Sequence, residues 1–228
     1  MDFEENSLKL IIGIAAAITG WLLAQVTSLM KDWLRARKIK SMLLNELADI
    51  DVEVDRLLIS LSRDLQIYGA KGIDNSVSTG VSNFVFSNYY KDALLYLNQH
   101  QRVSYQLIHL LVRNLNEGLD EIRDILTAVH KAHQRGELAS STVPWLEEWG
   151  DRVRAEYKNA ASLRWHVLFH LDNAKLPDLS LMTQVHESYL KYLSEIDDKV
   201  DALIEEGRNI DLVEFEKIYH PGMFRMGQ

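Results

Sequence analysis

The residues of this chain best suited to chemistry are two histidines, His166 and His170, in the segment "WHVLFH". A spacing of four puts both imidazoles on one face of a helix, which is how zinc and dinuclear sites are often built. A metal centre needs further ligands, and the H-E-x-x-H pattern is absent, since the pair His186–Glu187 has no second histidine. We therefore interpret His166 and His170 as a structural pair and expect no metal and no other cofactor.

Other reactive side chains do not form a catalytic pattern either. Adjacent carboxylates occur at Glu147–Glu148, Asp197–Asp198 and Glu205–Glu206, but neighbours on a helix point about 100° apart. With no cysteine in the chain, thiol nucleophiles and thiolate metal sites are excluded. Lys71 lies in a glycine-rich stretch without phosphate-loop spacing, and no nucleophile-elbow or dinucleotide signature is present. We expect that the protein is not an enzyme.

The dominant element is instead "LIIGIAAAITGWLLAQVTSLM", residues 10–30, which carries no charge. As a helix these twenty-one residues would rise roughly 31 Å, about the thickness of the hydrocarbon core of a bilayer. A cleaved signal peptide would need a basic leader and a small-residue cleavage site, whereas residues 1–9 are acidic. A buried core helix, the second alternative, seldom stays uncharged for this length. The stretch predicts a transmembrane helix.

The charges on either side of residues 10–30 predict its orientation. Residues 1–9 sum to −2 and residues 31–40 to +4, which leaves −10 for residues 41–228 of the net −8. Because basic residues near a span stay in the cytoplasm, we expect residues 1–9 outside and the rest inside, in a single-pass inner-membrane protein. These charges either set topology alone or also contact lipid headgroups. The border set is Lys31, Trp33, Arg35, Arg37, Lys38 and Lys40.

Small residues recur along the predicted span. One set steps by four and three, the spacing of left-handed helix pairs. A second, overlapping set steps by four throughout, the small-xxx-small pattern. Since close backbone approach drives association in lipid, this packing face predicts a homo-oligomer. The first set is Gly13, Ala17, Gly20, Ala24 and Thr27, and the second is Ala16, Gly20, Ala24 and Ser28.

Residues 31–68 continue without a glycine or proline as a juxtamembrane amphipathic helix. Its leucine stripe keeps a four–three spacing over Leu43, Leu47, Ile50, Val54, Leu57 and Leu61. Thirty residues separate Gly20 from Ile50, so at about 100° per residue the packing face and the leucine stripe differ by roughly 120°.

The remaining residues predict an antiparallel helical bundle with one flexible linker. Residues 69–87 form the linker, which begins with the Gly- and Ser-rich stretch "GAKGIDNSVSTGVS". The next segment, "NFVFSNYY" at residues 83–90, could be locally extended. Residues 88–228 supply the bundle, which packs with residues 40–68. We expect a helix over residues 88–135, ended by a left-handed Gly136, and a second helix from a Thr142 cap and Pro144 to about Asn173. A third should run from Asp178 to Gly207, with Met182 on its apolar side, and a short last helix should begin at Asp211.

The fold class is therefore all-α, with an N-terminal single transmembrane helix that continues into a cytoplasmic antiparallel helical bundle. The leading functional class is a self-associating membrane protein whose bundle docks a protein partner or senses a signal. The first alternative is a membrane-permeabilising effector of the bacterial toxin or phage-defence type. The second is a membrane-anchored helical enzyme that uses His166 and His170. Nucleic acid is excluded as a partner because an acidic body repels phosphate.

Overall fold

The structure, a computed structural model, describes residues 2–74, 76–136 and 142–209 of the 228. Every regular element in this part of the chain is helical, and the first helix is long and apolar at its N-terminal end, as predicted. The helix predicted from Asp211 onward lies outside the described residues. In chain order the elements are α1 (Asp2–Gly69), α2 (Phe84–Ala93), the 3-10 helix η1 (Leu94–Tyr96), α3 (Gln99–Gln134), α4 (Thr142–Asp172) and α5 (Gln184–Asn209).

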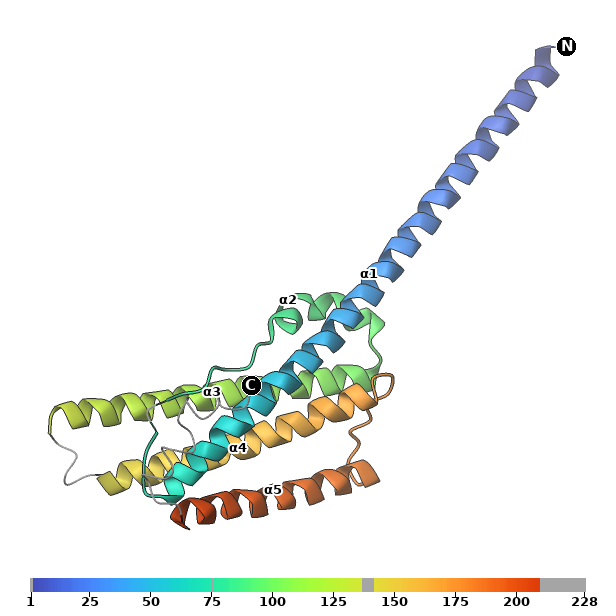
Figure 1. Ribbon diagram of the computed structural model, residues 1–228. Coiled ribbons are helices and arrows are strands. Elements are labelled where there is room, and N and C mark those ends of the chain that lie inside the picture. Colours follow the sequence, from blue (N-terminus) through green and yellow to red (C-terminus); the bar gives the residue numbers. More distant parts are fainter. Residues whose placement is uncertain (1, 75, 137–141, 210–228) are drawn as a thin grey trace, which may run out of the picture.

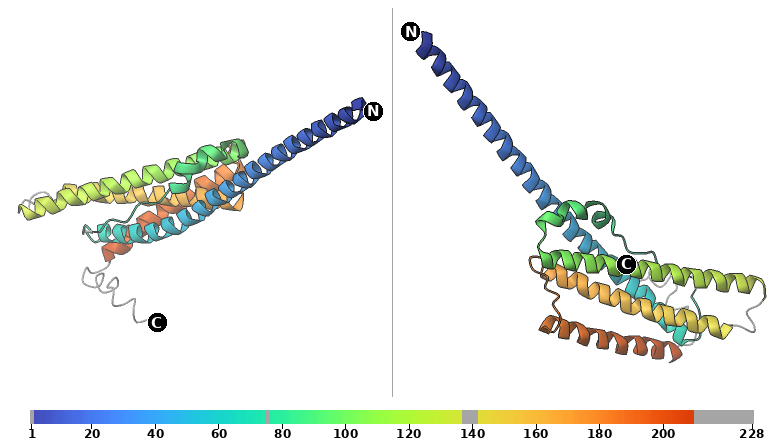
Figure 2. Two further views of the ribbon diagram at one scale, coloured as in Figure 1. Left: turned by 90° about the horizontal axis from the view of Figure 1, so that it is seen from above. Right: turned by 180° about the vertical axis from the view of Figure 1, so that it is seen from behind.

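The first half of α1 projects away from the rest of the chain as a single rod, and its second half packs among the other helices (Figure 1). There α1 contacts α2, α4 and α5, and α4 also contacts α3 and α5. The helices α3, α4 and α5 run in alternating directions, and α2 lies beside the point where α1 leaves them (Figures 1 and 2). We refer to the packed part, residues 36–209 as far as they are described, as the helical body.

The leucine stripe is the buried face of α1, and it forms the centre of the core. Its amphipathic four–three spacing puts one apolar side chain toward the body at nearly every turn. The side chains packed into the same cluster include Val112 of α3, Tyr157 of α4 and Val200 of α5. The core therefore draws on every long helix of the body, and α1 belongs to it from Ile39 onward.

The single helix predicted over residues 88–135 is wrong, because the chain breaks into α2, η1 and α3. Leu97 takes an extended conformation, with φ −92° and ψ 137°. Asn98 then caps α3: its side chain accepts from the Gln101 backbone N–H at 2.9 Å, and Gln101 Oε1 accepts from the Asn98 N–H at 3.1 Å. This reciprocal capping box ends one helix and begins the next. The segment "NFVFSNYY" is not extended either, since α2 begins at Phe84, inside the predicted linker.

The fourth predicted helix begins later than expected, at Gln184 rather than at Asp178. The Asp178 carboxylate accepts from the Ser180 N–H at 3.0 Å and from its hydroxyl at 2.6 Å, which holds a local turn instead. Met182 has a φ of 59° and is 91% exposed, so it does not belong to the apolar side of the helix. Thr183 provides the cap, accepting from the His186 N–H at 3.3 Å.

The ends of two helices show how closely the backbones approach. A Cβ on Gly69 would lie 2.1 Å from the Ile204 carbonyl oxygen, and one on Gly207 would lie 2.0 Å from the Gln66 carbonyl oxygen. The crossing of α1 and α5 therefore requires glycine on both sides. Gly136 after α3 has a φ of 73°, the left-handed conformation predicted for it.

Candidate functional site: the exposed segment of α1 and the buried cluster beneath it

None of residues 13–34 of α1 is buried against another part of the chain. Their large apolar side chains are between 50% and 68% exposed, and none of the most apolar eighteen-residue window is buried. Among the described residues this is the one segment long and apolar enough to cross a membrane by length and composition. A helix in the core of its own chain would be buried instead, so that alternative does not describe this segment. The side chains are Ile14, Ile18, Trp21, Leu22, Leu23, Val26, Leu29, Met30, Trp33 and Leu34.

The predicted packing face is open. A Cβ built on Gly13 or Gly20 would have no atom within 4 Å, and Ala17, Ala24 and Thr27 are exposed. The Thr27 hydroxyl donates to the Leu23 carbonyl oxygen at 2.7 Å, which pairs it within the helix. Such back-bonding lets a hydroxyl lie against lipid or a neighbouring helix without an unpaired donor.

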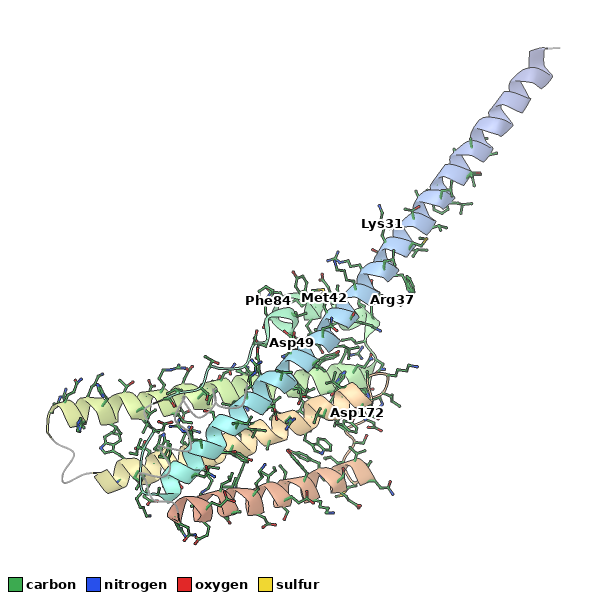
Figure 3. The ribbon with its side chains drawn as sticks, in the orientation of Figure 1. Lys31, Arg37, Met42, Asp49, Phe84 and Asp172 are labelled. Atoms are coloured by element: carbon green, nitrogen blue, oxygen red, sulfur yellow. The ribbon has the colours of Figure 1, made fainter. Side chains whose placement is uncertain are left out.

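The predicted basic border lies between the free segment and the body. Lys31, Arg35, Arg37 and Lys38 are exposed and Lys40 is half-buried; Figure 3 shows Lys31 and Arg37 on this part of α1. The Arg37 guanidinium lies 5.7 Å from the ring centre of Trp33, in the range of a cation–π contact.

One member of this border reaches the body. Arg35 Nη2 lies 2.5 Å from Asp92 Oδ2, so an ion pair joins α1 to the C-terminal end of α2. Both side chains are largely exposed, which makes this pair worth little stability. The pair lies beside the core contacts that hold α2 in place, since Tyr90 and Ala93 of α2 are buried in the core.

Glu46, on the C-terminal side of the border in α1, is buried and acts as the N-terminal cap of α2. Its two carboxylate oxygens accept from the backbone N–H groups of Val85 at 2.6 Å and Phe86 at 2.9 Å. These groups belong to the first turn of α2, whose own N-cap residue, Asn83, makes no side-chain cap bond. Burial raises the pKa of Glu46, and the two N–H bonds oppose that rise. A carboxylate from α1 thus holds α2 onto the body.

His109 of α3 completes this cluster as a neutral ring. Burial, and secondarily His170, lowers the pKa of His109 to about 3. His109 Nε2 lies 3.6 Å from Glu46 Oε2, too far for a hydrogen bond, and the ring stacks on Phe86 at 3.7 Å. Because the imidazole is uncharged at neutral pH, the contact with Glu46 is not a salt bridge.

The two histidines of "WHVLFH" are buried, and they contact different helices. His170 Nδ1 and the Ser104 hydroxyl of α3 lie 2.8 Å apart, whereas the His166 ring packs against Tyr189 of α5 at 4.8 Å. Burial lowers the pKa of each histidine to about 4. Within the residues that the structure describes, no three His, Asp or Glu side chains converge as a metal site would require.

Two features of this region were not predicted from the sequence. The capping role of Glu46 has no local signal, since Glu46 lies between stripe positions and its partners come 39 and 40 residues later. The corner between α2 and α3 did have one, the Asn98–Gln101 spacing of a capping box.

The chain matches no protein-family model, no curated protein and no solved structure. What it does is therefore inferred from the exposed segment of α1, its border and the body to which they are joined.

Proposed function

We propose that the protein is a single-pass inner-membrane protein that self-associates through its transmembrane helix. Residues 10–30 span the bilayer with the N-terminus outside. Residues 31–228 form a cytoplasmic helical bundle that docks a protein partner or senses a signal. The observation that supports this most strongly is the uncharged stretch of residues 13–30 of α1, none of which is buried and which is continuous with the helix at the centre of the core.

The physical reason is the unfavourable exposure of apolar side chains to water. Burial of a leucine- or isoleucine-sized side chain contributes about 1.5–3 kcal/mol, and this segment leaves ten large apolar side chains at least half exposed. A bilayer removes that cost, and a helix satisfies its own backbone groups within lipid. The border residues then meet the cytoplasmic headgroups.

The packing face is the observation that supports self-association. Gly20 and Ala24 belong to both small-residue sets, so leucine at these two positions should prevent close approach whichever crossing the helices use. We expect Gly20→Leu with Ala24→Leu to lower the signal in a membrane two-hybrid assay of the full chain. The matched control is Ile18→Leu with Val26→Leu, since these residues lie on the other side of the helix. An unchanged signal in the first variant would refute self-association through this face.

Topology is tested separately. In right-side-out vesicles, a tag at the C-terminus should be protected from added protease and a tag at the N-terminus should be digested. Digestion of the C-terminal tag in intact vesicles would overturn the orientation.

Two other functions make different predictions. A membrane-permeabilising effector shares the packing face but would depolarise cells, so we expect no change in a membrane-potential dye when the full chain is induced. The proposed role is also non-enzymatic. His166 and His170 contact separate helices, and this geometry does not support a site shared between them.

A further inference from the structure

The corner between α2 and α3, residues 94–97, presents apolar surface at the end of the body near the border. Leu95 is 91% exposed, and Tyr96 next to it is also exposed. Ala93 and Leu97, which flank them, are buried in the core. In Figures 1 and 2 α2 lies beside the point where α1 leaves the body. We refer to residues 94–97 as the apolar corner.

The apolar corner is held in place by several hydrogen bonds. Arg102 Nη1 of α3 donates to the Leu97 carbonyl oxygen at 2.8 Å, and the Tyr90 hydroxyl donates to the Arg102 carbonyl oxygen at 3.2 Å. Asn98, the cap of α3, also donates through Nδ2 to the Lys175 carbonyl oxygen at 2.8 Å. Leu95 is thus displayed on a braced turn, with its neighbours anchored in the core.

The ion pair between Arg35 and Asp92 shows which part of α1 lies beside the C-terminal end of α2. Arg35 follows Met30 by five residues, a rise of about 7.5 Å along the helix. The headgroup layer beyond the hydrocarbon core is roughly 5–8 Å thick on each side. Arg35 therefore lies at the cytoplasmic edge of the headgroup layer, with Asp92 beside it, and Leu95 follows Asp92 by three residues.

We propose that the apolar corner is a second membrane contact, which docks on the cytoplasmic surface of the bilayer that α1 spans. Leu95 and Tyr96 enter the headgroup region, where leucine and tyrosine side chains are favoured. The inference rests on the proposed transmembrane role of residues 10–30.

Charge and connectivity select the bilayer as the occupant. The basic border, with a net charge of +4 over residues 31–40, lies beside α2, where Lys91 and Asp92 cancel, whereas residues 41–228 as a whole are acidic. Anionic lipid at the cytoplasmic surface attracts such a basic cluster. Because α1 tethers the corner to the membrane, docking is intramolecular and needs little contact area.

Single-cysteine labelling of the full chain tests this directly, since the sequence has no cysteine. We would attach an environment-sensitive fluorophore to Leu95→Cys in proteoliposomes that contain anionic phospholipid and a lipid-borne quencher, placed either near the headgroups or within the acyl chains. Leu22→Cys, within the span, reports insertion. Ile59→Cys is the control, because Ile59 is 66% exposed and lies 29 residues beyond Met30 on α1, about 43 Å farther along the helix. Tyr96→Cys provides a second site in the corner, should Leu95→Cys lower the helical content.

We expect the lipid quencher to act several times more strongly on the Leu95 probe than on the Ile59 probe. Quenching at Leu22 without quenching at Leu95 would overturn the docking of the corner and leave the transmembrane role intact. A Leu95 probe shielded from aqueous iodide but untouched by the lipid quencher would indicate a protein partner and also overturn the inference. No quenching at Leu22 would show that the proposed span itself fails.

Discussion

Replacement of Glu46 by alanine should release α2 from the body while leaving the other helices packed. The Glu46 carboxylate supplies the only side-chain cap that the described residues give the first turn of α2, through bonds of 2.6 and 2.9 Å. Loss of a helix cap costs about 0.5–2 kcal/mol, and a hydrogen bond to a charged group is worth roughly 1.5–3 kcal/mol. Since the two bonds share one buried carboxylate, we expect a loss of about 2–4 kcal/mol, or roughly a 30- to 1000-fold fall in amide protection of α2.

Hydrogen exchange of the full chain in nanodiscs, read by mass spectrometry, measures this change. Peptides from α2 should exchange faster in Glu46→Ala, while peptides from α5 keep their protection. Glu53→Ala is the matched control, because Glu53 accepts a single bond, from the exposed Ser82 N–H at 2.8 Å. Unchanged exchange of α2 in Glu46→Ala, or an equal effect of Glu53→Ala, would refute the capping role.

Three further predictions concern stability. Gly207→Ala should lower the free energy of unfolding by about 1–3 kcal/mol, because its Cβ would lie 2.0 Å from the Gln66 carbonyl oxygen; chemical denaturation followed by circular dichroism, with the exposed Ser194→Ala as control, checks it. Lys71→Gly should raise the free energy of unfolding by about 0.5–1 kcal/mol, since Lys71 holds a left-handed φ of 65° after α1; a thermal midpoint at or below that of the wild type would contradict this. Burial raises the pKa of Asp64 to about 8, and the nearby carboxylate of Asp74 adds to that rise. The folded state therefore keeps a proton on Asp64 that the unfolded chain releases above the ordinary pKa of 3.8. This contribution to stability is full below that value and is lost as pH rises to about 8, so Asp64→Asn should flatten the decline by up to about 1.4 kcal/mol per pH unit, and equal slopes in the two proteins would count against it.

The features that the sequence predicts well are those coded by neighbouring residues. An uncharged run and the four–three spacing from Leu43 to Leu61 depend only on residues within a turn or two of each other. They indicate which face of α1 is apolar, and that face is the one the body buries. The break at Leu97 was missed because Leu94, Leu97 and Gln101 keep the helical spacing across it, although Asn98 and Gln101 marked a helix start.

Contacts between residues far apart in the chain leave no comparable pattern in the sequence. The crossing of α1 and α5 depends on two glycines far apart in sequence, Gly69 and Gly207. Each could be interpreted from the sequence as a helix end, and neither spacing nor composition pairs them. The same holds for Glu46 and α2, because a buried carboxylate near a leucine stripe resembles an ordinary charged flank until its partner is known.

The continuity of α1 has a consequence for any signal that passes between membrane and cytoplasm. No glycine or proline lies between Gly20 and Gly69, so this stretch lacks the residues at which helices usually bend sharply. The packing face at Gly20 and the buried face at Ile50 differ by roughly 120° about the helix axis. If two chains associate as proposed, through the first face, the core face stays covered by its own body, and the contact would determine how two bodies are turned relative to each other. A rotation of the proposed span in such an oligomer would then be carried into the core by the leucine stripe, because the stretch has no glycine or proline at which to bend.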